Sequence, residues 1–168
     1  MRNDCISINI IGVNAAGILN KIDSFDSWLT DKCPSIFSIQ ETKVPIKGQI
    51  HSDVIDFYQL YEHIRTNNPG QGGGLCIGVT RDLHSTLIRD GGDEVECITV
   101  QVEVDNQSLV IVSGYGPQES RSSPSHKEKF WAYLDREVEE AAMEEKLLVI
   151  QMDSNAWLGD KIIPGETK

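Results

Sequence analysis

The stretch IFSIQETKV, residues 36–44, joins an apolar segment directly to polar and charged residues. The apolar residues Ile36, Phe37 and Ile39 predict a buried strand, and Pro45 cannot donate to a further ladder of hydrogen bonds. Glu41 and Lys43 therefore come directly after the end of a core strand. A lone glutamate here is more often a surface residue, so the stretch indicates a functional site only if other strands end in a similar way.

Three other predicted strands do end on polar side chains. Asn14 follows the first strand, Tyr115 ends the strand SLVIVSGYG, and Asp153 and Asn155 end the last strand. Because strand ends in open sheets commonly meet along one rim where ligands bind, we expect these side chains to lie close together. Asp153 and Asn155 are two positions apart on an extended chain and face the same way. Carboxylate and amide oxygens suit a hard cation such as Mg²⁺.

Four short motifs resemble those of the endonuclease/exonuclease/phosphatase superfamily, whose fold is DNase I-like. In chain order they are VNAAGI, IQETK, SGYGPQ and MDSNAW. Their order and approximate spacing agree with the superfamily, and the resemblance places this chain at its N-terminal part. The most similar branch is the endonuclease domain of LINE-type retrotransposons, which nicks target DNA before reverse transcription.

The resemblance implies a role for each matching residue. Glu41 would bind Mg²⁺ or Mn²⁺ with Asn14 beside it, and Tyr115 would contact the scissile phosphate. Asp153 would orient or activate the attacking water, and Asn155 would hold the phosphate. These roles make physical sense because a metal with amide and phenol donors neutralises the charge that develops on a phosphodiester under attack.

The sequence departs from the superfamily pattern in three places. Ala16 replaces the second Asn or Asp of the first motif, and Met152 replaces the glycine before Asp153. The terminal Asp-His motif is missing, because His126 is the last of the four histidines, which are His51, His63, His84 and His126. General acid–base help from that histidine is typically worth about 10²–10⁴-fold. We therefore expect a truncated chain that is weakly active or inactive.

The predicted fold class is α+β, an α/β sandwich of the DNase I-like type, in a single domain over residues 1–168. Helical spacing predicts one helix from Ile18 to before Pro34 and a second over 124–145, with Ser125 as its N-cap. We expect one mixed β-sheet with flanking helices, lacking much of the second sheet. The sheet face left bare would then be covered by a homodimer or a partner chain; its residues are Ile98, Val100, Val102, Val104, Leu109, Ile111, Leu148 and Ile150.

The glycines in NNPGQGGGLCIGVT, residues 67–80, lead into an apolar strand. A loop that cradles phosphate needs a helix after its glycines, so that the helix N-terminus faces the anion. We therefore interpret these glycines as positions for positive φ or close strand approach.

Charge and cysteine content limit the partners and the compartment. The net charge of −11 argues against a general nucleic-acid or membrane binder, although it does not exclude a nuclease with a local basic rim. Four single cysteines without a CxxC pair indicate buried reduced thiols. No signal peptide or membrane helix is apparent, so we expect an intracellular protein of the cytoplasm or nucleus.

Three functions stay open at this point, and the sequence leaves it uncertain whether the chain is an enzyme. The first is Mg²⁺-dependent phosphodiester hydrolysis, with DNA as the implied partner. The second is a non-catalytic half-fold that dimerises or pairs with a missing half. The third is a phosphatase or phosphodiesterase acting on a substrate other than DNA, which the acidic charge mildly favours over tight duplex binding.

Overall fold

The computed structural model describes residues 7–67, 70, 72–118 and 122–155. Two helices and eight strands make up this part of the chain, together with three single turns of 3₁₀ helix at Leu19–Lys21, Ile55–Phe57 and Gly92–Glu94. The helices are α1 (Ile22–Lys32) and α2 (Pro124–Met143). The strands are β1 (Ile10–Asn14), β2 (Ile36–Gln40), β3 (Tyr58–His63), β4 (Leu75–Thr80), β5 (His84–Asp90), β6 (Cys97–Val104), β7 (Gln107–Tyr115) and β8 (Leu147–Asp153).

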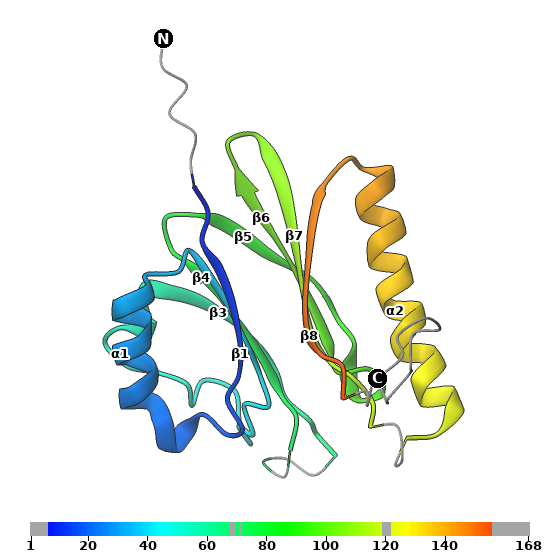
Figure 1. Ribbon diagram of the computed structural model, residues 1–168, viewed down its shortest axis with the longest axis horizontal. Helices are drawn as coiled ribbons and strands as arrows, with labels where there is room; N and C mark the ends of the chain where they lie inside the picture. Colours follow the sequence, from blue (N-terminus) through cyan, green and yellow to red (C-terminus); the bar gives the residue numbers. More distant parts are fainter. Residues whose placement is uncertain (1–6, 68–69, 71, 119–121, 156–168) are drawn as a thin grey trace, which may run out of the picture.

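The strands form two four-stranded sheets, ordered β1-β2-β4-β3 and β5-β6-β7-β8 (Figure 1). Each sheet is mixed, because β1 runs parallel to β2 and β8 runs parallel to β7, while the other neighbours are antiparallel. The expected α+β sandwich is therefore present, but the prediction of one sheet is wrong. Residues 81–83 join β4 to β5, a link as short as a hairpin loop, yet the two strands pair in different sheets. The alternation of apolar residues along the strands does not distinguish one sheet from two, since the same strand faces are buried in either arrangement.

The main core lies between the two sheets. The first sheet contributes side chains such as Ile36, Leu75 and Ile77, and the second contributes side chains such as Val100 and Ile111. These residues are at most 1% exposed. The sheet face that we expected to be bare is thus covered by the first sheet of the same chain.

This cover removes the argument for a dimer through that face. Ile98, Val100 and Val102 are buried against the first sheet, and Leu148 packs into the cluster under α2. Of the eight residues, Ile150 is 37% exposed and lies on β8, which is an edge strand of its sheet. A partner chain is therefore not needed to bury this core.

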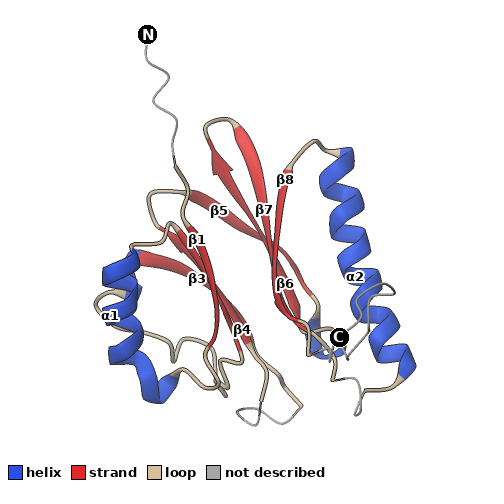
Figure 2. Cartoon of the chain, viewed as in Figure 1, coloured by secondary structure: helices blue, strands red, loops and turns tan. Residues whose placement is uncertain are grey.

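Each helix covers the outer face of one sheet (Figure 2). Phe25 and Leu29 of α1 pack on Phe37 and Ile39 of β2, and the rings of Phe25 and Phe37 meet edge to face at 5.3 Å. On the opposite side, α2 packs its apolar stripe against the second sheet; the helix residues are Phe130, Tyr133 and Leu134. The result is a helix–sheet–sheet–helix arrangement, in which β2 and β4 are buried on both faces.

The N-terminus of α2 differs in detail from the sequence prediction. Ser123, not Ser125, is the N-cap, and its side chain accepts a hydrogen bond from the backbone N–H of His126 at 3.2 Å. Pro124 then occupies the first turn, where its missing N–H has no helical partner to lose.

The cysteines of the described ranges are free, and they differ in exposure. Cys76 and Cys97 are buried, and burial raises the pKa of both thiols. Cys33 is exposed at the C-cap of α1, contrary to the expectation that all thiols are buried. Cys5 lies outside the described residues. Within them, no helix is long and apolar enough to cross a membrane.

Candidate active site

The ends of four strands meet at one edge of the sandwich. The parallel pairing of β1 with β2 sets Asn14 opposite Gln40, immediately before Glu41. The parallel pairing of β7 with β8 sets Tyr115 opposite Asp153 in the other sheet. Because both parallel pairs end at this edge, all five predicted site residues lie along it.

A buried polar cluster fixes the two sheets against each other next to this edge. Ser38 Oγ on β2 donates to Ser113 Oγ on β7 at 2.7 Å, and both side chains are fully buried. Gln40 Nε2 donates to Ser38 Oγ at 2.8 Å and approaches the carbonyl of Gln151 at 3.4 Å. Satisfied polar groups inside an apolar core specify one register, because any slip would leave them without partners.

Asn14, Asp153 and Asn155 form one hydrogen-bonded group. Asn14 Nδ2 donates to Asp153 Oδ2 at 2.7 Å, and the backbone N–H of Asn155 donates to Asp153 Oδ1 at 3.0 Å. Asn155 Nδ2 donates to the carbonyl of Gly116 at 2.8 Å, which ties the end of β8 to the loop after Tyr115. The Asp153 carboxylate is therefore held by a donor on each oxygen.

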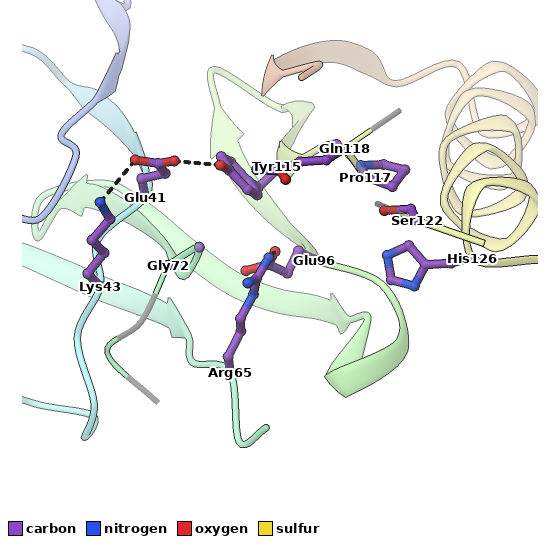
Figure 3. A pocket seen from close by; sticks show the side chains of 12 residues that line it. Glu41, Lys43, Arg65, Gly72, Glu96, Tyr115, Pro117, Gln118, Ser122 and His126 are labelled. Atoms are coloured by element: carbon purple, nitrogen blue, oxygen red, sulfur yellow. Dashed lines mark hydrogen bonds and ion pairs between the residues drawn. The ribbon is translucent and has the colours of Figure 1, made fainter. Parts of the chain in front are cut away.

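Tyr115 and Glu41 form a second group beside the first. The Tyr115 hydroxyl donates to Glu41 Oε1 at 2.5 Å, and Lys43 Nζ lies 3.5 Å from Glu41 Oε2 (Figure 3). Burial of the ring and the Glu41 carboxylate raise the pKa of Tyr115, with a smaller contribution from the Asp153 charge, while Asn155 opposes the shift. The phenol thus keeps its proton, and the influence of both carboxylates shows that the two groups share one site.

Strained backbone gathers at this edge. Ala16, Glu41, Lys43 and Asn155 have φ values of 47°, 53°, 53° and 46°, in the left-handed region that non-glycine residues avoid. Such residues cluster at functional sites, where the surrounding structure holds them in place. Here the hold comes partly from Gly17 N–H, which donates to the Glu41 carbonyl at 2.7 Å.

A cavity of about 370 Å³ adjoins Glu41 and Tyr115. Its wall also contains four charged or ionisable side chains that the motif comparison did not single out: Lys43, Arg65, Glu96 and His126. Lys43 follows Glu41 by two residues, so the sequence already indicates a basic side chain near this carboxylate. Arg65, Glu96 and His126 come from two loops and the first turn of α2, and no strand-end pattern marks them. Asn14, Asp153 and Asn155 lie outside this wall.

The histidines divide into separate environments. His63 is 2% exposed, and its Nδ1 lies 2.6 Å from Asp90 Oδ1. This pair lines a different cavity, together with Lys47 and Asp93. His126 is thus the histidine that the described residues place in the wall beside Glu41 and Tyr115.

The residues present fit a metal that is held by few protein ligands. In the described ranges, no group of three or more His, Cys, Asp or Glu side chains is placed to hold a metal ion. Mg²⁺, however, usually keeps several waters and binds through one or two carboxylates plus substrate phosphate. Glu41 meets that requirement, because each carboxylate oxygen accepts two bonds and Tyr115 uses only one of these positions. Asn14 would stand at the adjoining strand end.

Comparison with solved structures shows the fold. Humanized D. rerio TDP2 matches with a TM-score of 0.60 and 17% identity over 89% of this chain and 67% of its own chain. The endonuclease domain of TRAS1, a telomere-specific non-LTR retrotransposon, matches with a TM-score of 0.60 and 14% identity over 90% and 60%. The 3′ phosphatase NExo from Neisseria, solved with a product DNA hairpin, matches with a TM-score of 0.63 and 16% identity over 92% and 60%.

These matches are structures of the endonuclease/exonuclease/phosphatase superfamily, so the chain has part of that DNase I-like fold. It spans 60–67% of the three matched chains. The retrotransposon endonuclease is not singled out, because TDP2 and NExo match equally well. No family model matches the sequence, and no protein of curated function matches it.

Proposed function

We propose that the edge formed by Asn14, Glu41, Tyr115, Asp153 and Asn155 hydrolyses phosphodiester bonds with Mg²⁺ or Mn²⁺. The observation that supports this proposal is the convergence of two hydrogen bonds, Tyr115 to Glu41 and Asn14 to Asp153, from four strand ends in two sheets. The motif resemblance and the fold give the same direction. DNA is the proposed substrate, and nicking of the retrotransposon type is the proposed activity.

Each side chain has a part that its contacts permit. Glu41 would hold the metal, which when bound supplies positive charge for the scissile phosphate. Tyr115 keeps its single proton, which it donates to Glu41, and with a substrate bound it would donate that proton to a phosphate oxygen instead. The Asn155 amide has a second N–H, beyond the one on the Gly116 carbonyl, for the same purpose. Asp153, whose orientation is fixed by Asn14 and Asn155, can accept a proton from an attacking water.

We propose that turnover by this edge is low. Among the described residues, the hydrogen bonds to the Asp153 carboxylate come from Asn14 and Asn155, so Asp153 has no histidine partner for acid–base catalysis. His126 lines the neighbouring cavity and belongs to α2, the helix that covers the second sheet. Partial help from His126 would appear as slow nicking that depends on this residue.

A plasmid-nicking assay tests the proposal. Supercoiled plasmid with Mg²⁺ or Mn²⁺ should be converted slowly to open circles, and Glu41→Ala and Asp153→Ala should each abolish this conversion. Glu139→Ala, on the exposed face of α2, is the matched control and should nick like the wild type. Equal nicking by all four proteins would show that the activity does not come from this edge.

A substrate other than DNA is the second candidate, and the net charge of −11 is the observation that favours it. A small phosphodiester meets less repulsion from an acidic surface than a long polyanion does. Hydrolysis of bis(p-nitrophenyl) phosphate without any plasmid nicking would support this candidate. The interaction-module alternative has lost its main argument, since the chain covers its own inner sheet face.

A further inference from the structure

Arg65 occupies a defined place in the cavity beside the proposed active site. Its guanidinium carbon lies 5.8 Å from the centre of the Tyr115 ring, the same ring whose hydroxyl contacts Glu41. Figure 3 shows Glu96 and Arg65 next to each other below Tyr115, among the side chains that line the cavity. A group bound at Arg65 would therefore sit next to a group bound at Glu41 and Tyr115.

Glu96 holds this guanidinium in a fixed orientation. The Glu96 side chain is only 11% exposed, and its Oε2 accepts a hydrogen bond from Arg65 Nη2. Its other oxygen accepts from the backbone N–H of Gly74 at 2.7 Å, and its backbone carbonyl accepts from Tyr115 N–H at 2.9 Å. Arg65 is thus anchored through Glu96 to the strand end that carries Tyr115.

The glycine segment makes room for this pair. A Cβ at Gly73 would lie 2.0 Å from Glu96 Oε1 and 2.5 Å from Arg65 Nε, so no side chain fits there without moving the pair. Gly73 and Gly74 have φ values of 64° and 81°, a backbone conformation that glycine adopts without strain. The glycines that did not suit a phosphate-binding loop therefore shape the seat of Arg65.

The guanidinium keeps donors free for a ligand. Arginine carries five N–H donors in a planar fork, and the contact with Glu96 through Nη2 does not exhaust them. The side chain is 39% exposed and lines the cavity, and Lys43 adds a second cation to the same wall. A planar fork with free donors matches the oxygens of a phosphate group.

We propose that Arg65 binds the phosphate next to the scissile one, so that the substrate is a nucleic-acid strand with consecutive phosphates. This inference rests on the proposed function, because it takes the scissile phosphate to lie at Glu41 and Tyr115. It adds a binding subsite to that function and excludes an isolated phosphomonoester as the preferred substrate. Glu96 is then a positioning residue that acts through Arg65.

Salt-dependent binding tests the subsite. The probe is a fluorescein-labelled single-stranded oligodeoxynucleotide of about 12 nucleotides, measured by anisotropy in Ca²⁺ over a series of KCl concentrations. Each phosphate contact in a single strand contributes about 0.7 to the slope of log K against log salt. Arg65→Gln should weaken binding about tenfold at low salt and reduce that slope by about 0.7.

The matched control is Arg81→Gln. Arg81 is an exposed arginine at the far end of β4, where its Nε donates to the carbonyl of Asp56 at 2.8 Å. Its substitution should change neither affinity nor slope. Arg65→Lys keeps the charge but not the fork, and should retain the slope while weakening binding.

Three outcomes would overturn the subsite: no measurable binding of the oligonucleotide by the wild type, a wild-type slope in Arg65→Gln, or an equal slope change in Arg81→Gln. If Arg65 had only a structural role, the slope for Arg65→Gln would equal that of the wild type. If Arg65→Gln does not fold, Arg65→Lys decides through its affinity at constant slope. Binding in Ca²⁺ requires no cleavage, so the plasmid-nicking assay can fail or succeed independently of this result.

Discussion

Asn14, at the end of the first strand, donates a hydrogen bond of 2.7 Å to Asp153, at the end of the last. The two residues belong to different sheets, so this bond joins the sheets at the proposed active site. Asn14 is exposed, and Asp153 is only partly buried. A hydrogen bond between two such groups adds little to stability, which indicates that its value lies in orienting the carboxylate.

Asn14→Ala should therefore reduce activity more than stability. We expect hydrolysis to fall about 10–100-fold, as is typical when an orienting partner is lost, with a stability loss of about 1 kcal/mol. Asn9→Ala is the control, because the Asn9 amide donates to the carbonyl of Lys32 at 3.2 Å, away from the site. Kinetics with bis(p-nitrophenyl) phosphate and urea unfolding give the two quantities. An equal loss of activity in both variants would contradict the orienting role.

Glu41→Ala should remove metal binding. The Glu41 Oε1 atom accepts from Tyr115, whereas Oε2 has only Lys43 Nζ nearby, at 3.5 Å, so Oε2 can bind a metal ion. Loss of a direct ligand should lower the metal affinity by more than the about 10–100-fold that is typical of outer-shell partners. Titration calorimetry with Mn²⁺ measures the affinity. Glu139→Ala should bind Mn²⁺ as the wild type does. Unchanged affinity in Glu41→Ala would place the metal elsewhere.

Tyr115→Phe should lower hydrolysis about 10²–10³-fold, since it removes one donor aimed at the site. Because burial and Glu41 raise the pKa of Tyr115, the phenol should keep its proton above its ordinary pKa of about 10. The activity ratio of wild type to variant should thus stay constant between about pH 8 and pH 10, and fall only at higher pH.

The raised pKa of Tyr115 also makes the stability of the fold depend on pH. The contribution of Tyr115 to folding should be complete below about pH 10 and be lost as the pH rises through the folded-state pKa.

Tyr58→Phe is the control for the activity measurement with Tyr115→Phe, because the Tyr58 hydroxyl donates to the carbonyl of Pro34, outside the site. A ratio that already falls between about pH 8 and pH 9 would mean that phenolate forms early.

Gly73→Ala should both destabilise the protein and weaken oligonucleotide binding. Gly73 and Gly92 have nearly equal φ values, 64° and 63°, but a Cβ at Gly92 would meet nothing within 4 Å. Gly92→Ala should cost only the left-handed backbone term of about 1–2 kcal/mol. The additional loss in Gly73→Ala, measured by thermal unfolding, reports displacement of Arg65 and Glu96. Equal losses would show that the pair moves freely.

The core between the sheets should account for much of the stability. Ile111 is fully buried there, whereas Ile150 on the edge strand β8 is 37% exposed. Ile111→Ala should cost about 2–5 kcal/mol and Ile150→Ala much less, since only the first leaves a cavity. Denaturant unfolding measures both values.

The covered inner sheet faces also predict a monomer. Light scattering should show a mass of 18.7 kDa, and a dye that binds exposed apolar surface should not bind to the inner sheet faces. A dimer that dissociates in Ile150→Ala would show instead that the edge strand associates.

The sequence by itself determined the strands, the two helices and the polar residues at the strand ends. These features depend on local alternation, helical spacing and the stop at Pro34 and Pro45, all of which act between near neighbours in the chain. The motif order also carried the fold class, which the structural matches support.

Only the tertiary structure decided how the strands divide between two sheets and which loops meet beside Tyr115. The three-residue link between β4 and β5 passes from one sheet to the other, although its sequence is as compatible with a hairpin. Arg65 and Glu96 are 31 residues apart, and their contact depends on the space that Gly73 leaves. Such contacts are set by packing between distant segments, and no local periodicity encodes them.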